Sequence, residues 1–256
     1  MKDMPLEIEA IFLDLGNTLR ILVKDAGHQA KARQKIVELL RCDEAPVEFC
    51  EKLDARYKAY RKWAFENLKE APEDELWTRW LAPEFPAETV DPLAVELTYQ
   101  FRQSMGRRIV QPDGERVVHE LNQRGYCLGI ISNVITSREI PDWLTADGFD
   151  KYFKSVVLSS VFGRRKPDPA IYLEAARLAG VEPSRCVYVG DNLKRDVTGT
   201  RQAGFGMVII LLDPSDSDEL QIPEENKPDL IIHAFSQLLE IFPLFPIVKL
   251  PKAGGL

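Results

Sequence analysis

The stretch Ile8-Glu9-Ala10-Ile11-Phe12-Leu13-Asp14-Leu15-Gly16-Asn17-Thr18 decides the fold, because a short apolar run ends there at a carboxylate. An apolar run of this length, followed by turn-forming residues, is typical of a buried strand in a parallel sheet. Ligands of α/β proteins bind beyond the carboxyl ends of such strands, and Asp14 lies at that end. The sequence therefore predicts a functional carboxylate at the tip of the first strand.

Five further apolar runs have the same character, and amphipathic helical patterns such as 114–124 and 169–178 separate most of them. Gly125 and Gly180 follow these two patterns, where a left-handed helix cap is expected. The predicted strands after 8–13 are residues 126–131, 155–158, 186–189, 207–212 and 230–232. Alternating strands and helices with short connections predict an α/β fold with a doubly wound, Rossmann-like parallel sheet.

A long connection, residues 20–109, separates the first two core strands and is rich in Lys, Arg, Glu, Ala and aromatic residues. It is too long for a loop, so we expect a smaller helical subdomain that covers the crevice. The predicted helices span about 26–40, 46–68, 73–80 and 92–105. The predicted organisation is a core of residues 1–19 and 110–243, a helical cap of residues 20–109 and a loosely held tail of residues 244–256.

Composition and charge argue against several classes of protein. The 256 residues are 45% hydrophobic and carry a formal net charge of −7, with a pI near 5.2. Nucleic acids are bound through clustered Lys and Arg, which an acidic chain does not favour. No run of about 18 apolar residues indicates a membrane span, and the N-terminus shows no signal-peptide region. We therefore expect no nucleic-acid and no membrane partner. The four cysteines are scattered without metal-ligand spacing, and Cys127 and Cys186 fall in apolar runs as expected of buried free thiols, so we expect a cytoplasmic protein.

Three later segments supply what a carboxylate needs to attack phosphorus. Attacker and target are both negative, so the reaction requires a metal ion, a protein cation and hydrogen-bond donors. The segments are Ser132-Asn133, Lys166-Pro167-Asp168-Pro169 and residues 190–196, Gly-Asp-Asn-Leu-Lys-Arg-Asp. Together with residues 14–18 they resemble the signature motifs of the haloacid dehalogenase (HAD)-like hydrolase superfamily, in its phosphatase type with a helical cap inserted after the first strand.

The resemblance implies a magnesium-dependent phosphatase and gives roles to five positions. Asp14 corresponds to the nucleophile that forms an aspartyl-phosphate. Asp14, Asp191 and the backbone carbonyl of Gly16 would bind Mg²⁺, with waters completing an octahedron. Lys166 corresponds to the lysine that neutralises the phosphoryl group and tethers the nucleophile. Asp196 would lie behind the metal ligands and orient a bound water or Lys166.

The resemblance also implies a phosphate-binding set of Thr18, Ser132, Asn133 and Lys166. Thr18 would donate a hydroxyl hydrogen bond within the loop of Asp14, and Ser132 would donate one to a phosphoryl oxygen. For either residue alone, a structural role in a turn is an equal alternative. Asn133 would position the phosphoryl group through its backbone N–H. The expected substrate is a small phosphorylated metabolite, because a helical lid excludes bulky macromolecules. The chain itself is expected to be a monomer or a homodimer.

Position 16 departs from the family pattern. The residue two after the nucleophile is usually Asp, which protonates the leaving oxygen and then deprotonates the hydrolytic water. Losing such an acid–base group typically costs about 10²–10⁴ in rate. One interpretation is a phosphatase for leaving groups that need little protonation, such as acyl, anomeric or aryl phosphates. Another residue could instead replace the acid, and His28 at the start of the predicted cap is the candidate.

Two other interpretations stay open. Halide- and phosphonate-cleaving members of the family also lack the second Asp. Dehalogenases, however, do not carry the metal-binding Gly-Asp-x4-Asp pattern of residues 190–196. Phosphonate cleavage uses a cap lysine that nothing in this sequence singles out. The remaining interpretation is a catalytically weak or inactive pseudophosphatase, which binds phosphate and acts as an interaction or regulatory protein.

Overall fold

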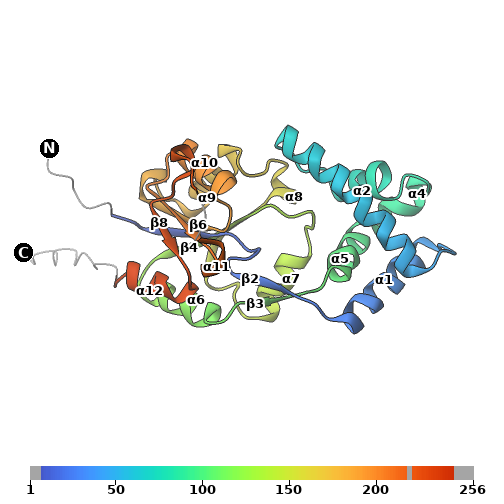
Figure 1. Ribbon diagram of the computed structural model, residues 1–256, viewed down its shortest axis with the longest axis horizontal. Helices are drawn as coiled ribbons and strands as arrows, with labels where there is room; N and C mark the ends of the chain where they lie inside the picture. Colours follow the sequence, from blue (N-terminus) through green and yellow to red (C-terminus); the bar gives the residue numbers. More distant parts are fainter. Residues whose placement is uncertain (1–6, 218–220, 245–256) are drawn as a thin grey trace, which may run out of the picture.

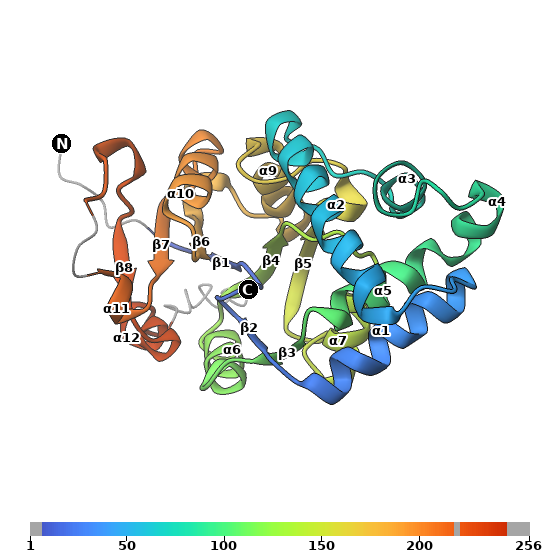
Figure 2. The same cartoon turned by 45° about the vertical axis from the view of Figure 1, so that its right-hand side comes forward.

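The computed structural model describes residues 7–217 and 221–244, and a six-stranded sheet lies at its centre. The strands are parallel and follow the order β5-β4-β1-β6-β7-β8 (Figure 2). Their bounds are β1 (Ala10–Leu13), β4 (Cys127–Ser132), β5 (Phe153–Leu158), β6 (Cys186–Gly190), β7 (Met207–Leu211) and β8 (Leu230–Ile232). The predicted doubly wound parallel sheet is confirmed.

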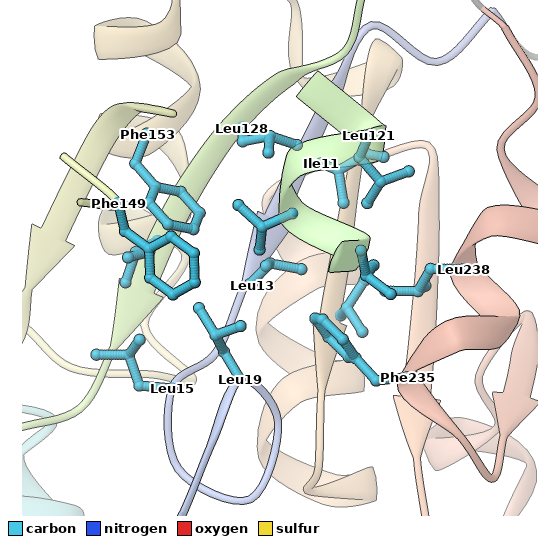
Figure 3. Packing of buried hydrophobic residues seen from close by; sticks show 14 of the residues in the cluster. Ile11, Leu13, Leu15, Leu19, Leu121, Leu128, Phe149, Phe153, Phe235 and Leu238 are labelled. Carbon is cyan, nitrogen blue, oxygen red and sulfur yellow. The ribbon is translucent and has the colours of Figure 1, made fainter. Parts of the chain in front are cut away.

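Strand β1 is buried on both faces because side chains alternate across a strand and both faces are covered. Ile11 and Leu13 belong to a hydrophobic cluster that also contains Leu121 and Leu238 (Figure 3). Ala10 and Phe12 point to the opposite face and pack in a second cluster. Burying a side chain of this size contributes about 1.5–3 kcal/mol. This is why an uninterrupted apolar run, rather than an alternating one, identifies the central strand.

Helices cover the two faces of the sheet and form a three-layered core (Figure 1). One face is covered by α6 (Gly114–Gln123), α7 (Glu139–Ala146) and α12 (Leu238–Ile241). The other is covered by α9 (Pro169–Ala179) and α10 (Leu193–Gln202), while α8 (Ser159–Phe162) and α11 (Pro214–Ser217) are short connecting turns. The carboxyl ends of the strands stay free of these layers and are available for a site.

A helical unit follows the first strand and packs around its own hydrophobic core. Its helices are α1 (Ala26–Leu40), α2 (Pro46–Asn67), α3 (Glu73–Glu75), α4 (Ala87–Val90) and α5 (Ala94–Ser104). The helix expected at 73–80 is a single α-helical turn that continues as a π-helix, Leu76–Leu81. Trp77 of this segment is fully buried, and its indole N–H donates to the Thr98 hydroxyl at 2.9 Å.

A two-stranded hairpin joins the helical unit to the core. Strand β2 (Arg20–Val23) leaves the core and β3 (Arg107–Val110) returns to it, paired antiparallel with Arg20 opposite Val110 (Figure 2). The helical unit also contacts the core beyond β5, where the Ser159 hydroxyl donates to Glu70 at 2.7 Å. Because β2 and β3 are paired, the chain leaves and re-enters the core at neighbouring positions. Arg102 near the end of α5 lines the same cavity as Asp14, which follows β1.

The description ends at Leu244, so the tail expected at residues 244–256 lies outside the described residues from position 245 onward. Across residues 7–217 and 221–244, no helix combines the length and the apolarity that crossing a membrane requires.

Candidate active site

The carboxyl ends of three neighbouring strands form one wall of a cavity of about 270 Å³. Asp14 follows β1, Ser132 ends β4 and Asp191 follows β6, and all three line this cavity. Because β1 lies between β4 and β6, residues 118 and 177 positions further along the chain come beside Asp14. The convergence expected at the sheet edge is present.

The Asp14 carboxylate is almost fully buried, with 5% of the residue exposed, and both of its oxygens are engaged. Oδ1 accepts from the Leu15 backbone N–H at 2.7 Å and from the Ser132 hydroxyl at 3.0 Å. Oδ2 lies 2.7 Å from Lys166 Nζ and accepts from Arg195 Nη2 at 3.0 Å. Two donors orient the group and two cations compensate its charge, so it is held in one orientation at the cavity wall.

Lys166 is completely buried behind Asp14, in a position that its neighbours fix. Its backbone N–H donates to Asn133 Oδ1 at 2.8 Å, and the Asn133 amide donates back to the Lys166 carbonyl at 3.0 Å. The Lys166 ammonium also donates to the Tyr188 hydroxyl and lies 3.4 Å from Asp196. Burial, with Asp14 and Asp196 nearby, raises the pKa of Tyr188 well above its ordinary value. The phenol therefore stays neutral.

Three carboxylates gather at this point, since Asp14, Asp191 and Asp196 each offer an oxygen within 4.8 Å of the others. Burial, reinforced by Asp14, raises the pKa of Asp191. Burial alone would raise the pKa of Asp196 as well, but Lys166 and Arg195 together hold it below its ordinary value. Asp196 lies outside the residues that line the cavity, whereas Asp14 and Asp191 face it.

The guanidinium of Arg195 lies among the three carboxylates. Nη2 is 3.0 Å from an oxygen of each of Asp14, Asp191 and Asp196, and Nε donates to Asp196 at 2.8 Å. Burial disfavours its charge, but Asp196 and Asp14 outweigh that effect and raise the pKa of Arg195. The acidic cluster thus contains a cation supplied by the chain itself.

The loop after β1 brings Gly16 and Asn17 to the cavity. A side chain added at Gly16 would enter open space, because no atom lies within 4 Å of the position its Cβ would take. Asn17 adopts a left-handed φ of 54°, which Asn tolerates better than most residues, and its amide donates to Asp191 at 3.0 Å. The missing carboxylate at position 16 therefore leaves a gap that the surrounding chain does not fill.

Two residues expected at the site lie elsewhere. Thr18 is fully buried, and within the described segments its hydroxyl has no hydrogen-bond partner and does not line the cavity. His28 lies at the start of α1, where its ring bonds to Gln103 at 3.0 Å, and it is not among the cavity residues. His28 therefore does not occupy the place of the absent acid.

Ser132 and Asn133 make contacts to two other predicted site residues, which the sequence did not indicate. The Ser132 hydroxyl bonds to Asp14, and the Asn133 side chain holds the backbone of Lys166. Sequence reasoning missed Arg195, although it lies in the first turn of α10, four residues after Asp191, and contacts that carboxylate at 3.0 Å. It also missed three arginines of the cavity, Arg20, Arg102 and Arg108.

Comparison with known proteins identifies the family. The sequence matches the haloacid dehalogenase-like hydrolases over residues 8–204, so the chain belongs to this family and is a hydrolase of the HAD type. It is 31% identical over 135 residues to the glyceraldehyde 3-phosphate phosphatase of Methanopyrus kandleri, across 50% of this chain and 57% of that protein. The chain thus spans little more than half of the length of the first curated relatives it matches.

Relatives that align over most of the chain have lower sequence identity. The glyceraldehyde 3-phosphate phosphatase of Pyrococcus furiosus is 26% identical over 242 residues, which cover 91% of this chain and 92% of the relative. Among solved structures, a 2-haloacid dehalogenase from Pseudomonas syringae has a TM-score of 0.64 at 23% identity, across 91% of this chain and 97% of that one. This structural likeness supports the fold alone.

Proposed function

We propose that this protein is a magnesium-dependent phosphatase of a small phosphorylated metabolite, acting through an aspartyl-phosphate on Asp14. The observation that carries the proposal is the environment of Asp14, which lines the cavity and whose Oδ2 lies 2.7 Å from Lys166 Nζ and 3.0 Å from Arg195 Nη2. A carboxylate with compensating cations can approach a phosphoryl group that unpaired charge would repel. The names of the related phosphatases support the same class of substrate.

In the proposed reaction an Asp14 oxygen attacks phosphorus, and the bond from phosphorus to the ester oxygen breaks. Water then attacks the aspartyl-phosphate, which releases inorganic phosphate and restores the carboxylate. Leu15 N–H and the Ser132 hydroxyl keep Asp14 in the attacking orientation, and Lys166 offsets negative charge beside it. The leaving oxygen takes its proton from water, since position 16 has no acidic group.

The donor set suits a hard divalent cation. Asp14 and Asp191 present carboxylate oxygens to the cavity, and the Gly16 carbonyl is the third ligand that we propose. The Arg195 guanidinium among these oxygens shows that the cluster accommodates positive charge. Mg²⁺ bound here would neutralise phosphoryl oxygens and lower the barrier to attack. Asp196 is compensated by Arg195 and Lys166, and we propose it as a residue that supports the ligands from behind.

Arg195 should compete with a divalent ion for Asp14 and Asp191. Replacing Arg195 with Met removes a cation that lies 3.0 Å from both carboxylates. We therefore expect Mn²⁺ to bind about tenfold more tightly, a change of roughly 1.4 kcal/mol. Electron paramagnetic resonance of free Mn²⁺ measures this without any turnover. The matched control is Lys194→Met, whose exposed side chain precedes Arg195. Equal affinities in the wild type and the Arg195 variant would contradict the competition.

A panel of phosphate monoesters tests the function itself. With Mg²⁺ we expect turnover of acetyl phosphate and aryl phosphates to exceed that of alkyl phosphates, because Gly16 offers no proton to a poor leaving group. EDTA should suppress turnover. Affinity for phosphate analogues without turnover of any ester would favour the pseudophosphatase instead. No lysine is among the residues described as lining the cavity, which argues against phosphonate cleavage through a lysine Schiff base.

We further propose that residues 20–109 act as a cap over a catalytic core of residues 1–19 and 110–243. The closure of the cavity by Leu22, Arg102 and Arg108 supports this division. Monomer and homodimer both fit the proposal, and a cytoplasmic location stays a prediction of the sequence.

A further inference from the structure

Besides Arg195, three further arginines line the same cavity as Asp14 and Asp191. Arg20 belongs to β2, Arg102 to α5 and Arg108 to β3. The hairpin and the last helix of the helical unit thus gather three guanidinium groups, which we call the arginine wall (Arg20, Arg102, Arg108). The catalytic roles proposed above use none of them.

The buried carboxylate of Glu139, on α7, forms ion pairs with two members of the arginine wall. Arg102 Nε donates to Glu139 at 2.7 Å, and Arg108 Nη1 lies 3.5 Å from the other oxygen of the same group. Arg20 instead lies over the ring of Trp143, 4.1 Å from its centroid, and donates to the Arg108 carbonyl. Its Nε is buried and has no hydrogen-bond partner within the described segments. The protein therefore leaves one donor of the wall unsatisfied.

The wall also carries positive charge that is only partly compensated. Burial lowers the pKa of Arg20 to about 10, although Glu139 and Asp147 oppose the shift. Burial likewise lowers the pKa of Arg108 to about 10, with Arg102 adding repulsion. Both groups stay protonated at neutral pH. Buried charge is costly unless it is paired, so an anion that enters the cavity would gain from this arrangement.

We propose that the arginine wall binds a second anionic group of the substrate, a carboxylate or a second phosphoryl group, while the scissile phosphoryl group lies at Asp14. This inference rests on the proposed function. Guanidinium groups match the paired oxygens of both anions. The cavity of about 270 Å³ restricts the substrate to a small molecule. The substrate class is therefore a small phosphate ester that carries two anionic groups.

Non-hydrolysable phosphonates test the inference by binding rather than by turnover. Isothermal titration calorimetry with Mg²⁺ present would compare ethylphosphonate, which has one anionic group, with phosphonoacetate and methylenebisphosphonate, which have two. We expect at least one of the two bifunctional ligands to bind about tenfold more tightly than ethylphosphonate, as charge-assisted hydrogen bonds allow. The tighter of the two identifies whether the wall takes a carboxylate or a phosphoryl group.

Variants of the arginine wall test whether these residues cause the tighter binding of the bifunctional ligands. Arg108→Gln should bring the ratio of bifunctional-ligand affinity to ethylphosphonate affinity close to one. If the Arg108 variant does not fold because it loses the contact with Glu139, Arg20→Met provides the same test. Circular dichroism melting establishes that each variant is folded. The matched control is Arg107→Gln, since Arg107 is the preceding residue of β3, points to the other face and pairs with Asp25 at 3.6 Å. It should keep the wild-type ratio.

The outcomes separate the inference from the proposed function. A wild-type ratio near one, with ethylphosphonate bound and phosphate esters turned over, would overturn the second subsite alone. An equal loss in the Arg107 and Arg108 variants would overturn it too. If no phosphonate binds and no ester is turned over, the proposed function fails and the inference fails with it.

Discussion

Replacing Asp14 with Asn is expected to abolish turnover of phosphate esters, by on the order of 10⁴-fold or more. An amide cannot form the acyl phosphate, yet Asn keeps the size of the side chain. Its oxygen can still accept from Leu15 N–H and the Ser132 hydroxyl. Release of inorganic phosphate from acetyl phosphate, with Mg²⁺ present, measures the effect.

A control must separate lost chemistry from lost structure, because Asp14 also compensates Lys166 and Arg195. Thermal unfolding of the Asn variant, followed by circular dichroism, establishes whether the core still folds. Ser132→Ala is the matched variant, since it removes one donor to Asp14 and leaves the carboxylate in place. We expect it to retain measurable turnover. A folded Asp14 variant with turnover within tenfold of the wild type would remove Asp14 from the mechanism.

A substitution at Gly16 is expected to increase turnover. Gly16→Asp should raise turnover of alkyl phosphates by about 10²-fold, the lower end of the contribution of a positioned general acid. The added side chain has room, because no atom lies within 4 Å of the Cβ position, and Gly16 faces the cavity. Acetyl phosphate should gain much less, since its leaving group needs little protonation.

The ratio of alkyl to acyl phosphate turnover is the informative quantity for position 16. Gly16→Asn adds nearly the same volume without an acidic proton, so it should leave this ratio at the wild-type value. If the Asp and Asn variants behave alike, filled space rather than proton transfer explains any gain. If Gly16→Asp leaves alkyl phosphates as slow as before, the absence of an acid at position 16 does not limit the reaction.

The fold could be predicted from the sequence because its central strands are buried on both faces. Such strands are continuous apolar runs, and 8–13 and 186–189 coincide with β1 and β6 to within two residues. The π-helix Leu76–Leu81 could not be predicted. Its sequence is compatible with an ordinary helix, and no local pattern marks the wider turn that contains the buried Trp77.

The strand-tip residues could be predicted for the same reason, since parallel order alone brings Asp14, Ser132 and Asp191 to one edge. The sequence does not indicate in the same way where a loop side chain points. Thr18 lies only four residues after Asp14, yet it is buried away from the cavity. His28 is turned toward Gln103 by the packing of α1 on α5.

The functional arginines carry no local signal in the sequence. In sequence they look like solvated surface charges, and only their surroundings in the fold distinguish them. Arg195 joins the acidic cluster because it lies in the first turn of α10, which begins at Leu193, two residues after Asp191. Arg20 and Arg108 are 88 residues apart and meet through the pairing of β2 with β3. A single sequence does not encode that register in any local pattern.

The most direct test of the account is whether phosphate becomes covalently attached to Asp14. Acid quenching during turnover of acetyl phosphate, borohydride reduction and peptide mass spectrometry would reveal an aspartyl-phosphate as homoserine at its position. We predict homoserine at position 14 in the wild type, a lower level in Gly16→Asp because the intermediate is hydrolysed faster, and none in Asp14→Asn. Sustained turnover with no modification at position 14, or with modification at another carboxylate, would contradict the account.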